Sequence, residues 1–321
     1  MSVLVYTENW DGKFKKLTHE LVSYAHQLAD QMGTDAVALS IGNVEKEELD
    51  SLSKFGAKKV ISAKGDHLSS LDDQAFAAII ANVAKKEDAN VVVIAHNFAG
   101  KAVAPRVAVK LRAGVVSGAT SLPVSLDPFT VKKGVFTGKA VANVEIKSEV
   151  KVVTLFQNAV DIIENPVDAT SEEYTPDVSE GDIKTKVLDT SKVTDKILLT
   201  DADIVVSGGR GMKSADKWNL IEELAGLLGA ATGCSRPVSD EGWRPHEEHV
   251  GQTGKIIAPN VYFALGISGA IQHLGGVSAS KHIIAVNTDK DAPIFEAADY
   301  GIVGDVHKVV PELIEKIKEA K

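Results

Sequence analysis

Cysteine is almost absent from this sequence, and aromatic residues and long apolar runs are scarce. One cysteine among 321 residues, Cys234, excludes an internal disulfide and a cysteine metal cluster, as is usual for proteins of reducing compartments. Aromatic residues make up 5% of the chain, and no apolar run approaches the roughly 20 residues of a membrane span. Strand-like residues begin at Ser2, which predicts no signal or transit peptide. We therefore expect a cytoplasmic protein that has no membrane segment and binds no metal.

A basic face is also missing. The formal net charge of -9 argues against nucleic-acid binding, which requires a positively charged surface, although a local basic pocket is compatible with it. Apolar residues make up 44% of the chain and are mainly Val, Ile, Leu and Ala, a mixture that suits parallel sheets buried under helices. The length is sufficient for two domains.

The hydrophobic pattern alternates between strand and helix in the first part of the chain. Predicted strands are 2–7, 36–41, 59–62 and 91–95, and predicted helices are 17–28 (closed by Gly33), 45–55, 75–84 and 102–111. This order implies right-handed crossovers and a mostly parallel sheet. Three further strands, at 130–135, 139–146 and 150–155, have no helices between them and predict an antiparallel addition.

The second part of the chain begins after a polar segment. Residues 165–194 are rich in Glu, Asp, Ser and Thr and predict a linker or wrapping arm. Strands are then expected at 202–206, 261–265, 283–287 and 300–303, and helices at 219–228 and 308–318. The sequence thus predicts an α/β protein of two doubly wound domains, at 1–195 and 196–321. The G-x-G-x-x-G fingerprint is absent, which disfavours a standard dinucleotide dehydrogenase.

Three glycine-bearing turns mark the candidate site: 207–211 (S-G-G-R-G), 251–254 (G-Q-T-G) and 266–269 (G-I-S-G). Two of them follow predicted strands. Free N–H groups at such turns favour a phosphate, and ligands gather at the carboxyl ends of strands in open α/β sheets. Polar side chains that could hold a large, flat, phosphate-bearing ligand lie among the turns: Arg210, Ser235, Arg236, Gln252, Thr253, Ser268 and His273.

Simpler interpretations of single residues stay open at this point. A turn of small residues after a strand is often only a helix start. His273 could be a hydrogen-bonded core histidine, and Arg236 a surface charge. Cys234 could be a reactive thiol, although a small filler residue is the better interpretation because no base is adjacent to it.

Longer motifs give the sequence a family resemblance. They are V-V-S-G-G-R-G at 205–211, G-C-S-R-P-V-S-D-E-G-W at 233–243, V-G-Q-T-G-K-I-I-A-P at 250–259, G-I-S-G-A-I-Q-H-L-G-G at 266–276 and A-P-I-F-E-A-A-D-Y-G-I-V-G-D at 292–305. Together they resemble the alpha subunit of electron-transfer flavoprotein. The resemblance implies a heterodimer with a beta subunit, FAD in the C-terminal domain, and an N-terminal domain that resembles a nucleotide-binding fold and helps to dock the beta subunit.

The resemblance also implies a role for individual residues. Arg236 matches the arginine set against the isoalloxazine ring, Thr253 the hydroxyl that bonds flavin N5, and His273 the imidazole at the pyrimidine carbonyl. The complete set of implied FAD contacts is Arg210, Ser235, Arg236, Val250, Gly251, Gln252, Thr253, Ser268, Gly269, Ala270, Ile271, Gln272, His273, Asn287 and Asp305. Two positions depart from commoner forms of the family: His249 replaces a frequent Gln and Thr288 a frequent Lys.

The implied function is electron transfer without substrate turnover. Members of the family take electrons from flavin dehydrogenases, such as the acyl-CoA dehydrogenases of fatty acid beta-oxidation, and deliver them to a membrane quinone reductase. A guanidinium and an imidazole donor would stabilise the negative charge that one-electron reduction places on the flavin. Two alternatives are an NADH-using electron-bifurcating flavoprotein and a flavin-dependent reductase. A third is a cofactor-free module that binds an adenine nucleotide.

Overall fold

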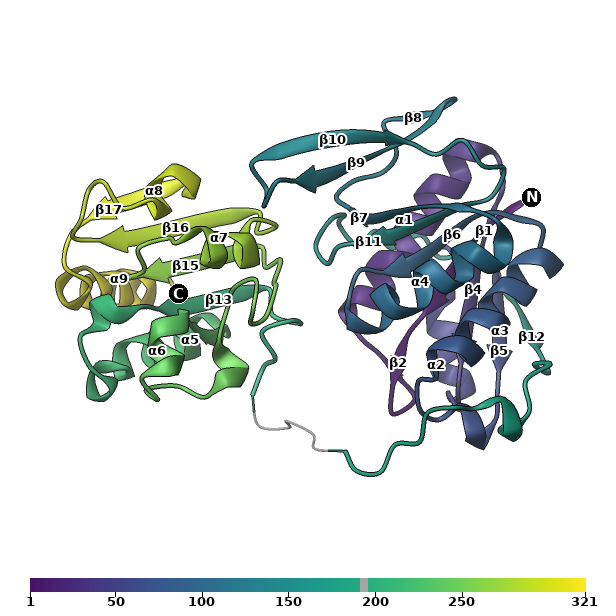
Figure 1. The fold of residues 1–321 in the computed structure, drawn as a ribbon, viewed down its shortest axis with the longest axis horizontal. Helices are drawn as coiled ribbons and strands as arrows, with labels where there is room; N and C mark the ends of the chain where they lie inside the picture. Colours follow the sequence, from purple (N-terminus) through teal and green to yellow (C-terminus); the bar gives the residue numbers. More distant parts are fainter. Residues whose placement is uncertain (191–195) are drawn as a thin grey trace. The chain divides into compact units, whose positions relative to one another are not determined.

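The computed structural model describes residues 1–190 and 196–321 and places them in two compact units (Figure 1). The first unit comprises 1–135 and 141–190, and the second comprises 136–140 and the C-terminal part of the chain. The expected domain boundary at 195 and the last residues of the expected linker, 191–194, lie outside the described residues. Each unit is an α/β structure built on its own sheet, as the sequence predicts.

A ten-stranded sheet forms the centre of the first unit, in the order β10-β9-β7-β11-β6-β1-β4-β5-β12, with β8 paired to β9. Its strands are β1 (Ser2–Thr7), β4 (Asp35–Ile41), β5 (Lys59–Ala63), β6 (Ala89–Ala95), β7 (Gly114–Ala119), β8 (Ser125–Leu126), β9 (Phe129–Val135), β10 (Ala140–Glu145), β11 (Lys151–Leu155) and β12 (Thr170–Glu173). A separate small ribbon pairs β2 (Asn9–Trp10) with β3 (Lys13–Phe14). The unit's helices are α1 (Lys16–Met32), α2 (Lys46–Asp50), α3 (Asp73–Lys86) and α4 (Phe98–Leu111), with 3₁₀ turns η1 (Ser51–Phe55), η2 (Asp66–Leu68) and η3 (Glu180–Asp182).

Helices cover both faces of this sheet, which explains why its central strands are apolar throughout. Alternate residues of β1 point to opposite faces: Val3 and Val5 pack in the core beneath α1, and Leu4 and Tyr6 in the core beneath α3 and α4. Gly33 ends α1 in the left-handed conformation, at φ +65°, as the sequence predicts.

Three strands of the first sheet differ from the sequence-based expectation. The antiparallel addition is confirmed for β9, which pairs antiparallel with β7 and β8. It is wrong for β11, which lies between β6 and β7 and is parallel to both. β7 was not expected, and the linker interpretation is wrong at β12, which adds a parallel strand beside β5. The apolar run of β11 suits either direction, so topology rather than composition decides it.

The second unit is a five-stranded, fully parallel sheet in the order β14-β13-β15-β16-β17. Its strands are β13 (Ile204–Gly208), β14 (Ala231–Cys234), β15 (Val261–Leu265), β16 (His282–Asn287) and β17 (Tyr300–Val303). Its helices are α5 (Asn219–Leu228), α6 (Arg236–Asp240), α7 (Ile271–Val277), α8 (Ile294–Ala297) and α9 (Val306–Ala320), with 3₁₀ turns η4 (Arg210–Met212), η5 (Ala215–Lys217) and η6 (His246–Glu248). The strand order 2-1-3-4-5 is doubly wound, and it reverses direction between β13 and β15.

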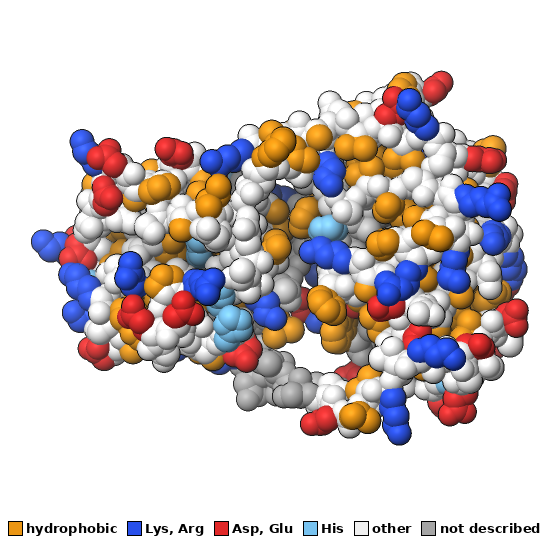
Figure 2. All heavy atoms as spheres, in the orientation of Figure 1, with side chains coloured by type: hydrophobic (Ala, Val, Ile, Leu, Met, Phe, Trp, Pro, Cys, Tyr) orange, Lys and Arg blue, Asp and Glu red, His pale blue; other side chains and the backbone are white. Residues whose placement is uncertain are grey.

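Charges of both signs are mixed over the surface. On the face shown in Figure 2, acidic and basic side chains alternate, and neither unit presents a broad field of one sign. Within the described residues, no helix combines the length and the apolar character needed to cross a bilayer.

Candidate functional site

The candidate site lies at the carboxyl edge of the second sheet, where ligands of doubly wound folds bind. The parallel register sets Gly208, Cys234 and Leu265 level with one another at the ends of β13, β14 and β15. The segments that follow these strands carry Arg210, Ser235 and Arg236, and the turn 266–269. The sheet therefore brings together residues separated by more than 50 positions in sequence.

Two of the glycine turns pack directly against each other at the point where the strand order reverses. The N–H of Gly209 donates to the carbonyl of Leu265 at 2.9 Å, and that of Gly211 to the carbonyl of Gly266 at 3.0 Å. A Cβ on Gly209 would lie 2.2 Å from the oxygen of Gly266, and one on Gly211 2.6 Å from its Cα. These glycines are thus required because the two loops lie in close contact. Sequence spacing alone could not distinguish this packing role from a role in binding phosphate.

The third turn, 251–254, is bound to α7. The N–H of Gln252 donates to the carbonyl of Gln272 at 2.8 Å, and that of Ile257 to the carbonyl of Gly276 at 2.9 Å. Val250, which precedes the turn, donates from its N–H to Cys234 at 3.0 Å. The turn is therefore held between the end of β14 and α7, and it leaves the side chains of Gln252 and Thr253 exposed.

The cationic residues of the site are free to meet a ligand. The side chain of Arg236 is 64% exposed and pairs with Asp240, at 3.3 Å on the same short helix. Arg210 is exposed at the start of η4. Ser268, Ala270, Ile271 and Gln272 are also exposed, whereas Ser235, Val250 and Gly269 are buried; φ is +84° at Gly269.

His273 is buried, unlike the other ring contacts that the resemblance implies. It is 6% exposed, and its Nε2 lies 2.7 Å from the hydroxyl of Tyr262 on β15. Burial lowers the pKa of His273 to about 4, partly offset by the adjacent Val250 carbonyl. The ring is consequently neutral at pH 7. The Tyr262 hydroxyl occupies Nε2, and Nδ1 is also buried, near the backbone of Val250.

The lowered pKa of His273 predicts a loss of stability in mild acid. Between the unfolded value of 6.5 and the folded value of about 4, the unfolded chain binds a proton that the folded chain does not, so unfolding becomes easier as pH falls through that window. The complete effect is about 3 kcal/mol. In a Trp10→Phe background, tryptophan fluorescence reports only Trp218 and Trp243 of the second unit. The free energy of unfolding, measured with urea, should decrease as the pH is lowered from 7 to 4, and it should decrease less in His273→Phe. An equal decrease in both proteins would contradict the assignment of this pKa shift to His273.

Cys234 does not have the properties of a reactive thiol. It is fully buried at the end of β14. Burial, with a smaller contribution from the Glu248 carboxylate, raises the pKa of the Cys234 thiol to about 12. Because the thiolate is the nucleophile, the filler interpretation of this residue is favoured.

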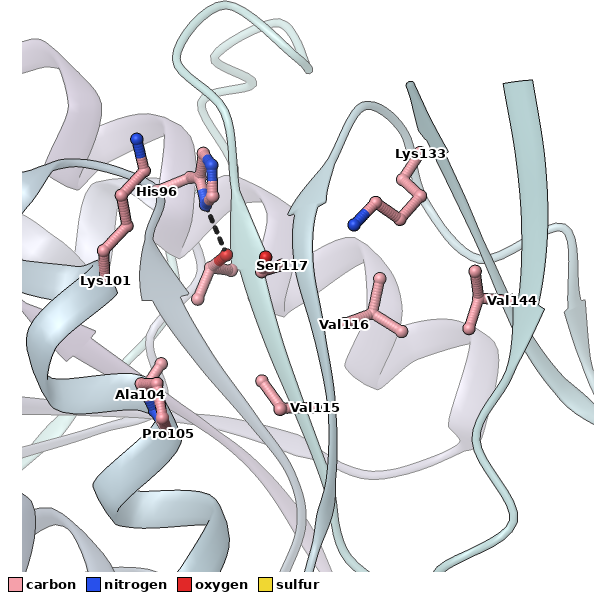
Figure 3. A pocket seen from close by; sticks show the side chains of 10 residues that line it. His96, Lys101, Ala104, Pro105, Val115, Val116, Ser117, Lys133 and Val144 are labelled. Atoms are coloured by element: carbon pink, nitrogen blue, oxygen red, sulfur yellow. Dashed lines mark hydrogen bonds between the residues drawn. The ribbon is translucent and has the colours of Figure 1, made fainter. Parts of the chain in front are cut away.

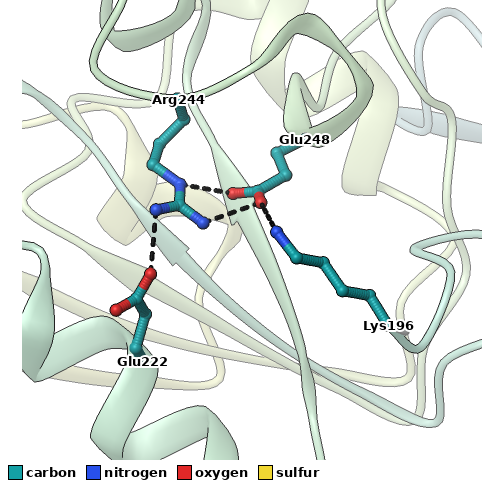
Figure 4. A network of polar contacts seen from close by, with 4 residues as sticks. All are labelled: Lys196, Glu222, Arg244 and Glu248. Carbon is teal, nitrogen blue, oxygen red and sulfur yellow. Dashed lines mark hydrogen bonds and ion pairs between the residues drawn. The ribbon is translucent and has the colours of Figure 1, made fainter. Parts of the chain in front are cut away.

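A polar network anchors the segment that leads into the 251–254 turn (Figure 4). The guanidinium of Arg244 binds Glu248 through two hydrogen bonds of 2.8 Å and Glu222 through one of 2.8 Å, and Lys196 lies 3.4 Å from Glu248. The side chains of Arg244 and Glu248 are 15% and 8% exposed. The pair therefore fixes the chain immediately before His249.

His249, which departs from the family's frequent glutamine, lies beneath the 251–254 turn. It is 3% exposed, and a Cβ on Gly254 would meet its Nδ1 at 2.7 Å. Burial, the neighbouring His246 and Arg236 lower its pKa, and Asp240 acts in the opposite direction. The second departure, Thr288, is exposed after β16.

Asn287 and Asp305, the implied FAD contacts at the β16–β17 end of the sheet edge, already have structural partners. Asn287 donates from Nδ2 to the carbonyl of Ile267 at 2.8 Å, and so supports the 266–269 turn. Asp305 caps α9 through the N–H of His307 at 3.0 Å and pairs with Lys213 at 3.2 Å. These two contacts lower the pKa of Asp305. A ligand at this end would meet side chains whose orientation is already fixed.

The donor set fits an elongated, phosphate-bearing cofactor. From β14 to β17 the edge spans four strand spacings of about 4.8 Å, or about 19 Å, so only a long ligand could meet both Arg236 and Asp305. The exposed guanidinium groups of Arg210 and Arg236 match phosphate and anionic ring oxygens.

Sequence reasoning missed Tyr262 and the Arg244–Glu248 pair. A tyrosine within a strand and a pair of opposite charges at i, i+4 do not by themselves indicate a functional site.

Comparisons with known proteins cover nearly the whole chain. Residues 3–183 match the profile of the Electron transfer flavoprotein domain, and residues 198–278 match the Electron transfer flavoprotein FAD-binding domain. Electron transfer flavoprotein subunit alpha of Thermoanaerobacterium thermosaccharolyticum is 38% identical, covering 99% of this chain and 98% of that protein. The subunit of the same name from Syntrophomonas wolfei is 37% identical, covering 98% of each chain. Acryloyl-CoA reductase electron transfer subunit beta of Anaerotignum propionicum is 33% identical, covering 99% of this chain and 96% of that protein.

Proposed function

Because this chain belongs to the family of electron transfer flavoprotein alpha subunits, whose FAD-binding domain it contains, we propose that it carries electrons one at a time through FAD in a heterodimer with a beta subunit. Its donors are flavin dehydrogenases such as acyl-CoA dehydrogenases, and its acceptor is a membrane quinone reductase. It acts in the cytoplasm as a carrier without substrate turnover of its own. The observation that carries the proposal is the family match along both units, with exposed guanidinium groups at the carboxyl edge of the second sheet.

The proposed FAD site comprises the fifteen residues that the family resemblance implies, from Arg210 to Asp305. FAD, when bound, supplies one- and two-electron redox chemistry that no side chain here provides. Arg236 supplies a permanent positive charge near the ring, and Thr253 a hydroxyl on the turn next to it. His273, held by Tyr262 at 2.7 Å, would supply a neutral imidazole. The Arg244–Glu248 pair and α7 hold the turn in place.

The domain assignment is part of the same proposal. The first domain, 1–195, docks the beta subunit, and the second, 196–321, binds FAD.

A second candidate partner comes from the name of one relative, an acryloyl-CoA reductase electron transfer subunit. It favours an alternative in which this chain belongs to an NADH-using, electron-bifurcating flavoprotein that serves an acyl-CoA reductase. Rapid NADH oxidation by the purified heterodimer with FAD would favour this alternative over the simple carrier.

Co-expression with the candidate beta subunit tests the proposal directly. The expected result is a yellow heterodimer with FAD, which takes up electrons in two separate steps during reductive titration. His273→Gln should lower the potential of the first step, because a donor to the charged ring is weakened, while FAD content stays near that of the unmodified protein. Tyr262→Phe is the matched control, since it removes the hydroxyl but keeps the imidazole. An unchanged first potential in His273→Gln would count against the assigned role of His273.

A further inference from the structure

A cavity of about 440 Å³ opens in the first unit (Figure 3). It lies near the carboxyl ends of β6 and β11, between α4 and the strands β7, β9 and β10. Its lining residues are His96, Lys101, Ala104, Pro105, Val115, Val116, Ser117, Lys133, Val144 and Thr154. The volume is in the range of small-molecule sites, and the position is one at which α/β sheets bind ligands.

The charged groups that line this cavity are all positive. Lys101 comes from the first turn of α4 and Lys133 from β9. Within the part of the chain that the structure describes, neither lysine forms an ion pair with a carboxylate, and no Asp or Glu is among the lining residues. Two unpaired ammonium groups beside one cavity favour an anion of more than one charge.

Polar groups at the base of the cavity are held in a defined orientation. The N–H of Gly118 donates to Thr154 Oγ1 at 2.9 Å, and Thr154 Oγ1 lies 2.8 Å from His96 Nδ1. With one lone pair used by Gly118, the Thr154 hydroxyl can donate to Nδ1, so that a neutral His96 carries its proton on Nε2. Burial, together with the smaller effects of Lys101 and Lys133, lowers the pKa of His96 to about 4. His96 is therefore a neutral donor at pH 7.

The rest of the lining is apolar. Val115 lies on the same side of β7 as Ala104 and Pro105 of α4, and Val116 and Val144 lie on its other side (Figure 3). A free inorganic ion would leave this surface in contact with water, whereas a phosphate attached to a small apolar group would cover it.

We infer that this cavity binds the phosphate group of a small phosphate monoester, with Lys101 and Lys133 contacting the phosphate and the apolar side chains of Ala104, Pro105 and Val115 contacting its organic part. This site is separate from the proposed electron-transfer role and does not depend on it.

Phenyl phosphate and inorganic phosphate are suitable probes, titrated into the full chain in complex with its beta subunit at constant ionic strength. We expect saturable binding in calorimetry, tighter for phenyl phosphate than for inorganic phosphate. Lys101→Gln and Lys133→Gln should each weaken it by about tenfold or more, because a charged contact is lost. Lys132→Gln is the matched control: Lys132 is the exposed neighbour of Lys133 and points to the opposite face of β9. It should leave the affinity unchanged.

A second readout follows the His96 ring by NMR of histidine-labelled protein. A dianion beside it should raise the pKa of His96 from its value near 4, and the Lys101→Gln/Lys133→Gln double variant should remove that response. Equal binding in the double variant and the unmodified protein would overturn the inference, as would the absence of saturable binding. If the complex binds no phosphate and the lysine variants instead weaken association of the subunits, the cavity holds an acidic side chain of the partner and the inference is wrong.

Discussion

Replacing Glu248 with alanine is expected to lower the free energy of unfolding of the second unit by about 3 to 5 kcal/mol, since it leaves a largely buried guanidinium without its main partner. Arg244 is 15% exposed and cannot lose its proton. Two of its three hydrogen bonds of 2.8 Å go to Glu248. Urea unfolding in the Trp10→Phe background, where Trp218 and Trp243 report on this unit, measures the change.

Two controls separate the buried pair from a general effect of charge removal. Glu223 pairs with Lys318 at 2.8 Å, but both side chains are about half exposed; Glu223→Ala should therefore cost less than about 1 kcal/mol. The double variant Arg244→Met/Glu248→Leu removes both charges and should recover most of the stability. A Glu248→Ala protein as stable as Glu223→Ala would show that the network does not anchor this segment.

Gly276→Ala should displace the 251–254 turn and, since we propose that this turn contacts the cofactor, lose most of the bound FAD. A Cβ at this position would lie 2.4 Å from the Cα and 2.6 Å from the nitrogen of Gly251. Both are backbone atoms, so no side chain can rotate to make space, and α7 must move away from the turn. Overpacking of this kind costs about 1 to 3 kcal/mol. The movement would also strain the hydrogen bonds from Gln252 and Ile257 to α7.

Gly226→Ala is the matched control for that substitution. Gly226 is also a helical glycine of the second unit, but no atom lies within 4 Å of its Cβ position. Alanine there should stabilise the unit by about 0.5 to 1 kcal/mol and leave FAD content unchanged. The FAD-to-protein ratio of purified heterodimers, read from absorbance, distinguishes the two variants. Full FAD content in Gly276→Ala would contradict the proposed position of the turn.

Two of the strands that sequence reasoning missed, β12 and β14, have no hydrophobic pattern. β12 has the sequence T-S-E-E, and charge pairs hold it at the sheet edge: Glu172 lies 2.8 Å from Lys59 and Glu173 2.7 Å from Lys64. β14 has four residues, A-T-G-C, too few to show a period. The long apolar strands β1, β4, β6 and β15 were predicted because burial on both faces leaves a continuous apolar run.

The candidate site could be predicted in composition but not in detail. The motifs identify Arg236, the 251–254 turn and α7, and the sheet brings their segments to one corner. The Tyr262–His273 contact depends on the register between a strand and a helix, which local sequence does not encode. Likewise, only coordinates reveal that Gly209, Gly211 and Gly266 make space for one another.

A structure of the heterodimer with FAD, from crystals or by electron cryomicroscopy, tests the central claim most directly. Our account predicts that the cofactor runs along the carboxyl edge of the second sheet, with its ring against Arg236 and Thr253 and within reach of His273. FAD bound elsewhere, or a ring from which the Arg236 guanidinium and the His273 imidazole both point away, would contradict it.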